Sequence, residues 1–172
     1  SSLPGAASLF DCTCIPGYTQ NNGTVIGATA GQFPNCDSLS TAEPERSLPV
    51  CERCEQGKFK PASGPHVCTL CPQGKYSAAT GAVTEDTCVP CPTNKTTLTA
   101  GMLVVASCKC QAGFEPLGPD CIACNVGQYK FAIADYACAL CAAGTFSDRI
   151  GTEQCSKCAA GTYWGGIGGT SS

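Results

Sequence analysis

The stretch CALCAAGTFSDRIGTEQCSKCAAGTYW, residues 138–164, contains the same phrase twice. Each copy is a pair of cysteines two residues apart, followed after two residues by a glycine and, one residue later, by an aromatic residue. We write this phrase C-x2-C-x2-G-x-[FY]. A phrase that recurs at fixed spacing is typical of an array of small supersecondary units, each stabilised by its neighbours. The extent of the repeat along the chain therefore decides the fold.

Five copies of the main phrase span much of the chain; they begin at Cys51, Cys68, Cys121, Cys138 and Cys155. A shorter variant, C-x-C-x2-G-[FY], begins at Cys12 and again at Cys108. The pair Cys88-Cys91 opens like the main phrase but continues without the glycine and the aromatic. This order predicts three segments: residues 1–50 with an insertion around Cys36, residues 51–107 with cysteine-rich repeats, and residues 108–172 as a second block with an incomplete last repeat.

The composition favours disulfide bridges over a hydrophobic core. The chain has 17 cysteines in 172 residues, whereas Leu, Ile, Val and Phe together number only 29. That is too little apolar surface to offset the chain entropy of a domain of this length, so cross-links must supply much of the order. Zinc is the rival explanation of the C-x2-C pairs. The single histidine, His66, and the even spacing of the pairs argue against it, so we expect no metal and no cofactor.

Each part of the phrase has an expected structural role. The glycine allows a positive φ or a close backbone approach, and the aromatic residue covers a disulfide in place of a core. A second glycine before the next pair, as in Thr80-Gly81 and Gly151-Thr152, reverses the chain. Asp135-Tyr136 replaces this glycine in one unit. The predicted fold is a small disulfide-rich one: an elongated array of short irregular β-hairpins closed by a ladder of disulfides, with little helix and a minimal hydrophobic core.

The simplest ladder joins the second cysteine of each pair to the first of the next. It predicts six bridges: Cys54–Cys68, Cys71–Cys88, Cys91–Cys108, Cys110–Cys121, Cys124–Cys138 and Cys141–Cys155. The four cysteines at the start are expected to form Cys12–Cys51 and Cys14–Cys36, which leaves Cys158 unpaired. Connectivity does not follow from spacing alone, and a crossed alternative, with Cys71–Cys91 and Cys88–Cys108 beside Cys110–Cys121, stays open.

Disulfides place the chain outside the cell or in the secretory lumen. The first residues, SSLPGAASLF, lack the features of a signal peptide, so a leader has been removed or the chain is part of a longer protein. The longest apolar run, 101–106, is too short to span a membrane. A net charge of −3 with few charged residues also argues against nucleic-acid binding.

The segments from Cys71 to Cys88 and from Cys141 to Cys155 resemble the ephrin-receptor-like cysteine-rich repeat. They are also similar to the first loop of tumour-necrosis-factor-receptor repeats, and the C-x-C variants resemble the C-terminal half of an EGF-like module. The resemblance implies an extracellular rod of disulfide-closed units, as in animal receptors and in long surface proteins of algae and protists, such as the flagellar hairs called mastigonemes. The EGF-type calcium site needs an acidic cluster, and Asp11 before Cys12 is too little for one.

No catalytic constellation is evident, so we expect no enzyme. His66 lies between Pro65 and Val67 in a small loop, and no base can be named for Cys158. The sequence favours a non-catalytic structural repeat that associates with itself, as a homopolymer or with neighbouring repeats of a longer chain, in an extracellular filament or coat. The alternative is the stalk or ligand-binding part of a receptor or adhesion ectodomain.

Several surface sites are expected beside the bridges. Asn22 and Asn94 lie in N-glycosylation sequons and should be exposed, so glycans are expected to be covalently attached. Thr96, Thr97 and Thr99 are candidates for O-linked sugars. Tyr163 and Trp164, in a glycine-rich stretch, are candidate contact residues. Cys158 opens a unit whose closing cysteine would follow shortly after Ser172, with an intermolecular bridge as the alternative.

Overall fold

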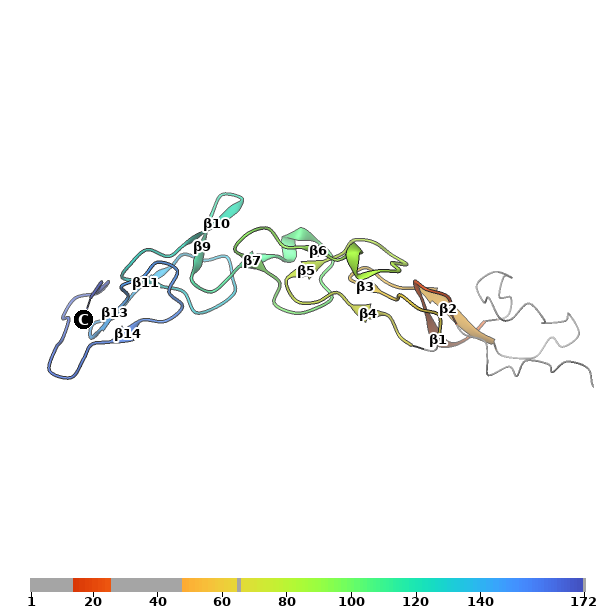
Figure 1. Ribbon diagram of the computed structural model, residues 1–172, viewed down its shortest axis with the longest axis horizontal. Coiled ribbons are helices and arrows are strands. Elements are labelled where there is room, and N and C mark those ends of the chain that lie inside the picture. The colour runs from red at the N-terminus through yellow and green to blue at the C-terminus, as the bar shows by residue number, and fades with distance from the viewer. Residues whose placement is uncertain (1–13, 26–47, 65, 172) are drawn as a thin grey trace, which may run out of the picture. The chain divides into compact units, whose positions relative to one another are not determined.

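The computed structural model describes residues 14–25, 48–64 and 66–171 (Figure 1). Their backbone contacts divide into two compact units. The first unit contains the described residues up to Cys71 together with 77–89. The second contains residues 72–76 and the described residues from Pro90 onward.

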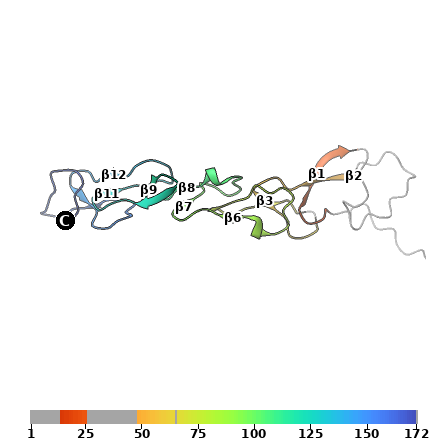
Figure 2. The same ribbon diagram turned by 90° about the horizontal axis from the view of Figure 1, so that it is seen from above.

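The described strands pair as seven two-stranded hairpins, most of them with strands of only two residues (Figures 1 and 2). The pairs are β1 (Tyr18–Val25) with β2 (Leu48–Arg53), β3 (Lys58–Phe59) with β4 (Thr69–Leu70), β5 (Lys75–Tyr76) with β6 (Val89–Pro90), β7 (Lys95–Thr96) with β8 (Lys109–Cys110), β9 (Phe114–Leu117) with β10 (Asp120–Ala123), β11 (Gln128–Tyr129) with β12 (Ala139–Leu140), and β13 (Thr145–Phe146) with β14 (Ser156–Lys157).

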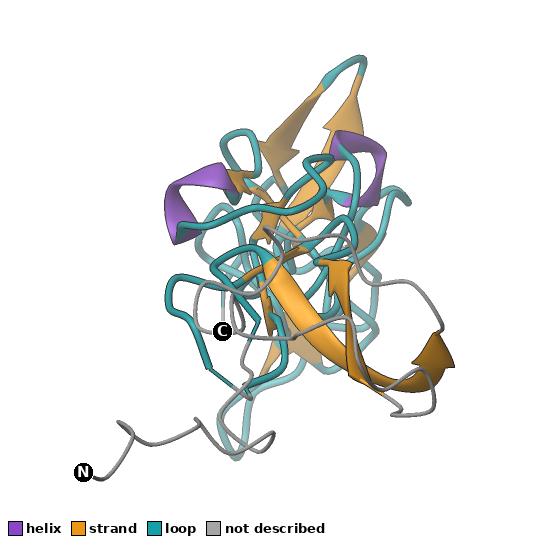
Figure 3. Ribbon diagram, turned by 90° about the vertical axis from the view of Figure 1, so that its right-hand side faces the viewer, coloured by secondary structure: helices purple, strands orange, loops and turns teal. Residues whose placement is uncertain are grey.

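Helix is confined to two single 3-10 turns in the described chain, η2 (Glu85–Thr87) and η3 (Val105–Ser107), and loops join the short strands (Figure 3). Isolated hairpins of this size are marginal in water, so they need another source of stability. The seven disulfides supply it. The predicted class, a small disulfide-rich array of hairpins with little helix, is therefore confirmed.

The structure contains all six bridges of the simple ladder and none of the crossed pairs. Each encloses a short loop, with sequence separations of 11 to 17 residues and Cα–Cα distances of 5.6–5.8 Å. The pairs are Cys54–Cys68, Cys71–Cys88, Cys91–Cys108, Cys110–Cys121, Cys124–Cys138 and Cys141–Cys155. Cys158 is the free cysteine of the described chain.

The expected pairing at the start of the chain is wrong. Cys51 bonds to Cys14, which excludes both Cys12–Cys51 and Cys14–Cys36. Cys12 and Cys36 lie outside the described residues. The cause is the β1–β2 hairpin, which places Tyr18 opposite Arg53 just as the β9–β10 hairpin places Phe114 opposite Ala123. Both hairpins bring the second cysteine of a C-x-C phrase beside the first cysteine of the next pair, so the ladder rule holds even across the insertion.

The buried apolar residues are mostly half-cystines. Of those in the described chain, only Phe59 and Ala82 are not cysteines. Phe59 packs against Cys71 and Cys88, which form one bridge, and Tyr18 packs against the bridge between Cys14 and Cys51. An aromatic side chain thus covers a disulfide at these two places, as the phrase predicts.

The phrase glycine, three residues after the second cysteine, has a left-handed backbone in every copy. Its φ lies between 74° and 89° at Gly57, Gly74, Gly127, Gly144 and Gly161. Asn94 occupies the same place after Cys91 and has a φ of 60°, the one non-glycine residue with a positive φ in the described chain. Asparagine is among the few residues that tolerate this region. The Cys88-Cys91 phrase is therefore a complete hairpin in which Asn94 replaces the glycine.

Candidate functional site

One register position of the repeat is buried and polar. The buried position is our name for the sixth residue after the second cysteine of a phrase, which directly follows the aromatic position in the sequence. It holds the only buried polar residues of the described chain, all with at most 3 % exposure: Lys60, Ser77, Thr97, Lys130 and Ser147. Burying a polar group is costly unless it is hydrogen-bonded. Each buried position must therefore have its own partners.

Lys60 is surrounded by backbone carbonyl groups. Its Nζ donates to the carbonyl oxygens of Tyr18 and Gly64, both at 2.7 Å, and more weakly to that of Cys14 at 3.5 Å. Burial lowers the pKa of this ammonium group. The three carbonyls come from the preceding phrase and from the turn of the hairpin that carries Lys60, so the side chain joins both.

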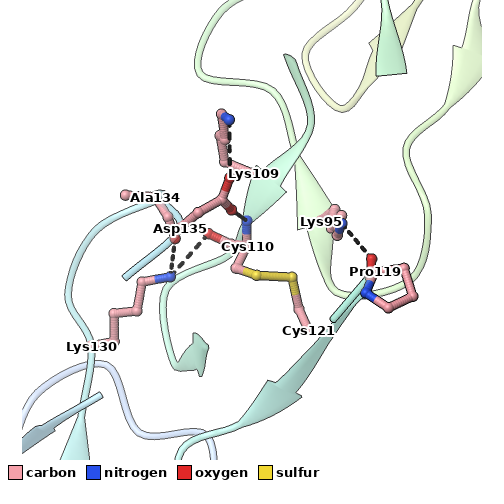
Figure 4. A network of polar contacts seen from close by, with 8 residues as sticks. All are labelled: Lys95, Lys109, Cys110, Pro119, Cys121, Lys130, Ala134 and Asp135. Carbon is pink, nitrogen blue, oxygen red and sulfur yellow. Dashed lines mark hydrogen bonds and ion pairs between the residues drawn. A yellow bond between two sulfur atoms is a disulfide. The ribbon is translucent and has the colours of Figure 1, made fainter. Parts of the chain in front are cut away.

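Lys130 lies in a second carbonyl cage (Figure 4). Its Nζ donates to the carbonyl oxygens of Phe114 at 2.6 Å, Cys110 at 3.3 Å and Gln111 at 3.4 Å, and also to that of Ala134. The ring of Tyr136 lies 5.0 Å from the ammonium, within range of a cation–π contact. Burial lowers the pKa of Lys130, and the nearby carboxylates of Asp135 and Glu115 oppose that shift.

The two cages use equivalent residues. Cys14 and Cys110 are both the second cysteine of a C-x-C phrase, Tyr18 and Phe114 are both its aromatic residue, and Gly64 and Ala134 both lie four residues after the lysine. The first cage belongs to the first compact unit and the second cage to the second. Lysine is thus present at the buried position directly after each C-x-C phrase, whereas Ser77, Thr97 and Ser147 fill it elsewhere.

Asp135 stabilises the turn in which Asp135-Tyr136 replaces the turn glycine. Its Oδ1 accepts the Cys110 N–H at 3.1 Å, and its Oδ2 lies 2.9 Å from the Lys109 Nζ (Figure 4). Burial by itself raises the pKa of Asp135, but the Cys110 N–H, the Lys109 side chain and the charge of Lys95 outweigh it and hold the pKa below its usual value.

A repeated backbone pattern links successive hairpins. In three places an N–H of the turn donates to the carbonyl of the second cysteine one hairpin earlier, at 2.7–2.8 Å: Gly81 to Cys54, Gly151 to Cys124 and Gly168 to Cys141. The same cysteines donate to the preceding phrase glycine: Cys54 to Gly17, Cys124 to Gly113 and Cys141 to Gly127. Each turn glycine also lies directly against that phrase glycine. A Cβ on Gly17, Gly113 or Gly127 would stand 2.2–2.5 Å from the carbonyl oxygen of Gly81, Gly151 or Gly168, respectively.

The described surface contains shallow hollows of mixed polarity. One of about 320 Å³ is lined by Thr19, Glu52, Arg53, Glu55, Lys58, Val67 and Cys68. Glu55 forms an ion pair there with Lys58 at 2.7 Å, and the hydrogen bond and charge of Lys58 lower the pKa of Glu55. His66 is exposed. In the described chain no three His, Cys, Asp or Glu residues are grouped to hold a metal ion.

The expected modification sites differ in their surroundings. Asn94 is half-buried rather than exposed, and its Nδ2 donates to the Cys121 carbonyl at 3.0 Å. Thr97 is fully buried, and its Oγ1 accepts the Gly74 N–H and donates to the Thr99 carbonyl. Its hydroxyl is therefore not available for a sugar. Thr96 is half-buried and Thr99 exposed. The side chain of Asn22 lies outside the described residues.

The candidate contact residues lie on the surface. Tyr163 is 86 % and Trp164 47 % exposed. Trp164 is at the buried position of the last phrase, and its carbonyl accepts the Gly144 N–H at 2.9 Å, as the carbonyl of Ser147 accepts that of Gly127. The backbone register thus persists to Trp164, whereas its side chain remains exposed.

The buried lysines and Asn94 were missed by the sequence reasoning. A signal was present, because the residue after the aromatic position is Lys, Ser or Thr in five phrases. The signal is therefore the recurrence of a polar residue at one position of the repeat and not the residue types, which are usually exposed.

A family model described as tyrosine-protein kinase ephrin type A/B receptor-like matches residues 45–88 and 131–172, which together make up half of the chain. Comparison with curated proteins found no match. Within the described residues, no helix has the length and apolar character needed to cross a membrane.

Proposed function

Because the chain belongs to the ephrin type A/B receptor-like family, we propose that it is a non-catalytic structural module of a secreted or cell-surface protein. Cysteine-rich modules of this type suggest a receptor-type extracellular region, and seven disulfides require an oxidising compartment. In this role the hairpins form a spacer whose units are closed by disulfides.

The observation that carries this proposal is the repeated backbone pattern. The turns at Gly81, Gly151 and Gly168 are each bonded to the cysteine of the preceding hairpin and touch the phrase glycine of the hairpin before that. Such a pattern uses backbone atoms and half-cystines and leaves side chains free to vary. It supports a role in which the order and spacing of units matter more than a particular reactive group.

Location and oxidation state test the proposal together. An antibody against this segment should label intact cells or the medium. In native material, the cysteines of the seven described bridges should give no titratable thiol. Labelling that needs permeabilised cells, together with titratable thiols at most cysteines, would contradict it.

The last two phrases support a finer proposal of self-association. Whereas Gly17, Gly113 and Gly127 are each covered by a turn glycine, a Cβ built on Gly144 or Gly161 would meet nothing within 4 Å. Cys158 is unpaired nearby, and Trp164 is exposed at a position that is buried in five other hairpins. A further hairpin of the same kind would fill these places, and we propose that a second copy provides it.

Light scattering over a concentration series tests this association. The wild type should associate, Gly144→Ala should remain monomeric, and Gly118→Ala should behave as the wild type. Gly118 is the matched control, because it also has a positive φ and open space beside it. Cys158→Ser separates a covalent dimer from non-covalent association. A monomeric wild type at all concentrations would contradict self-association and favour the ligand-binding receptor segment, for which the exposed Tyr163 and Trp164 are the available contact residues.

Covalent glycans remain part of the proposal at Asn22 and Asn94. At Asn94 one amide hydrogen is used by the Cys121 carbonyl, so a sugar would replace the other. Mass spectrometry before and after glycosidase treatment of native material tests both sites; an unchanged mass for each glycopeptide would reject them.

A further inference from the structure

The disulfides form a nearly continuous path along the chain. Two residues lie between the end of each bridge and the start of the next, except at Lys109, where a single residue intervenes. Among the described bridges the loops follow one another without overlap, because each of these bridges joins the second cysteine of one phrase to the first cysteine of the next. This order differs from the crossed pattern, in which the loops closed by Cys71–Cys91 and Cys88–Cys108 would overlap.

We propose that the segment is a tension-bearing tether whose length under load is set by its disulfides. Between Cys14 and Cys155, a pull on the two ends passes through the seven bridges of the described residues and the short linkers between them, while the residues inside the closed loops carry none of it. The inference rests on the proposed extracellular function only in that an oxidising compartment keeps the bridges formed.

Chain geometry gives the size of the effect. From Cys14 to Cys155 the bridged path consists of seven Cα–Cα spans of 5.6–5.8 Å and the linkers, so it extends to about 100 Å at most. The same stretch without bridges would extend to about 480 Å. The hairpins themselves are weak, with strands of two residues, but their rupture releases almost no chain while the bridges are intact.

Reduction converts the tether into an extensible chain by a balanced exchange. A thiolate of dithiothreitol attacks one sulfur of a bridge, which breaks the protein S–S bond and forms a mixed disulfide. The second thiol of the reagent then closes its own disulfide, so the reagent loses two electrons and two cysteine thiols are formed. Each event frees one loop: about 30–55 Å for the loops of 11 to 17 residues and about 120 Å for the loop of 37 residues.

Single-molecule pulling on the full oxidised chain, through handles at its two termini, tests the proposal. Without reductant we expect no unfolding steps between Cys14 and Cys155 larger than about 20 Å, and with dithiothreitol seven steps of the sizes above. The double variant Cys54→Ala/Cys68→Ala should gain about 40 Å without reductant. Cys158→Ser is the control and should behave as the wild type.

Two results would overturn the proposal. One is release of more than about 100 Å without reductant; the other is a set of step sizes that fits overlapping loops. Because the pulling experiment uses purified oxidised protein, its failure is distinct from failure of the proposed function, which cell labelling decides.

Discussion

At the scale of single residues, the fold depends on a few positions with unusual demands. The buried position takes Lys, Ser or Thr, and the phrase glycine takes only Gly or Asn. Where Lys60 and Lys130 occur, an ammonium group satisfies carbonyls contributed by two consecutive hairpins. The shorter side chains bond differently: Ser147 donates to the Arg149 carbonyl within its own loop. Thr97 donates to the Thr99 carbonyl of its own loop and accepts the Gly74 N–H of the preceding phrase.

Lys130→Met should destabilise the second unit. The methionine fills much of the space, but the carbonyls of Phe114 and Ala134 lose their donor, which we expect to cost about 2–3 kcal/mol. Denaturant unfolding with the disulfides intact measures the change, and Lys157→Met on the exposed β14 is the control. Equal stability of the two variants would show that the cage has no energetic role.

Asn94 should tolerate glycine better than alanine. Glycine keeps the φ of 60° and loses only the Cys121 hydrogen bond, whereas alanine also strains the backbone by about 1–2 kcal/mol. Denaturant midpoints of Asn94→Gly and Asn94→Ala give the comparison. If the alanine variant were as stable as the glycine variant, the left-handed conformation would not be required in solution.

Asp135 should make stability depend on acid pH. Its pKa is below the unfolded value of about 3.9, so the unfolded chain binds the proton more readily. The stabilisation is complete above that unfolded pKa and is lost as pH falls through the lower pKa of the folded state. Unfolding between pH 5 and pH 2 should show a smaller acid-dependent loss for Asp135→Asn; an unchanged slope would contradict the account.

At the scale of the hairpin, the packing of one hairpin against another depends on the close approach of a turn glycine to a phrase glycine. Gly127 is covered by Gly168, with no room for a side chain, whereas Gly144, at the same place in the next phrase, is open. The φ of these phrase glycines is nearly the same, 76° and 79°. An alanine at either position therefore incurs the same backbone strain, and the two variants differ only in the contact that its Cβ would meet.

Gly127→Ala should be much more damaging than Gly144→Ala. Both variants incur about 1–2 kcal/mol of strain from the positive φ, but only Gly127→Ala pushes a Cβ into the Gly168 carbonyl. We expect hydrogen exchange at Gly168 and Ser147 to accelerate at least tenfold in Gly127→Ala alone. Similar exchange in the two variants would mean that the glycine contact does not hold the hairpins together.

At the scale of the whole molecule, the sequence predicts much of the fold because the bridges are local. The six ladder pairs from Cys54 to Cys155 follow from one rule, and the rule also applies to Cys14 and Cys51 although 36 residues separate them. The expected pairing failed there because it left Cys14 and Cys51 outside the ladder and paired Cys14 with the lone Cys36. By contrast, the lysine cages depend on carbonyls of a neighbouring hairpin, and the buried Thr97 depends on the N–H of Gly74 in the preceding phrase. Spacing alone does not reveal the positions of these groups.

Disulfide mapping of the native protein tests the central claim most directly. Proteolysis without reduction, followed by tandem mass spectrometry, should recover Cys14 linked to Cys51, Cys71 to Cys88 and Cys91 to Cys108, in line with the other four bridges. A Cys71–Cys91 or Cys14–Cys36 peptide would contradict the ladder, and with it both the backbone contacts between successive hairpins and the tether.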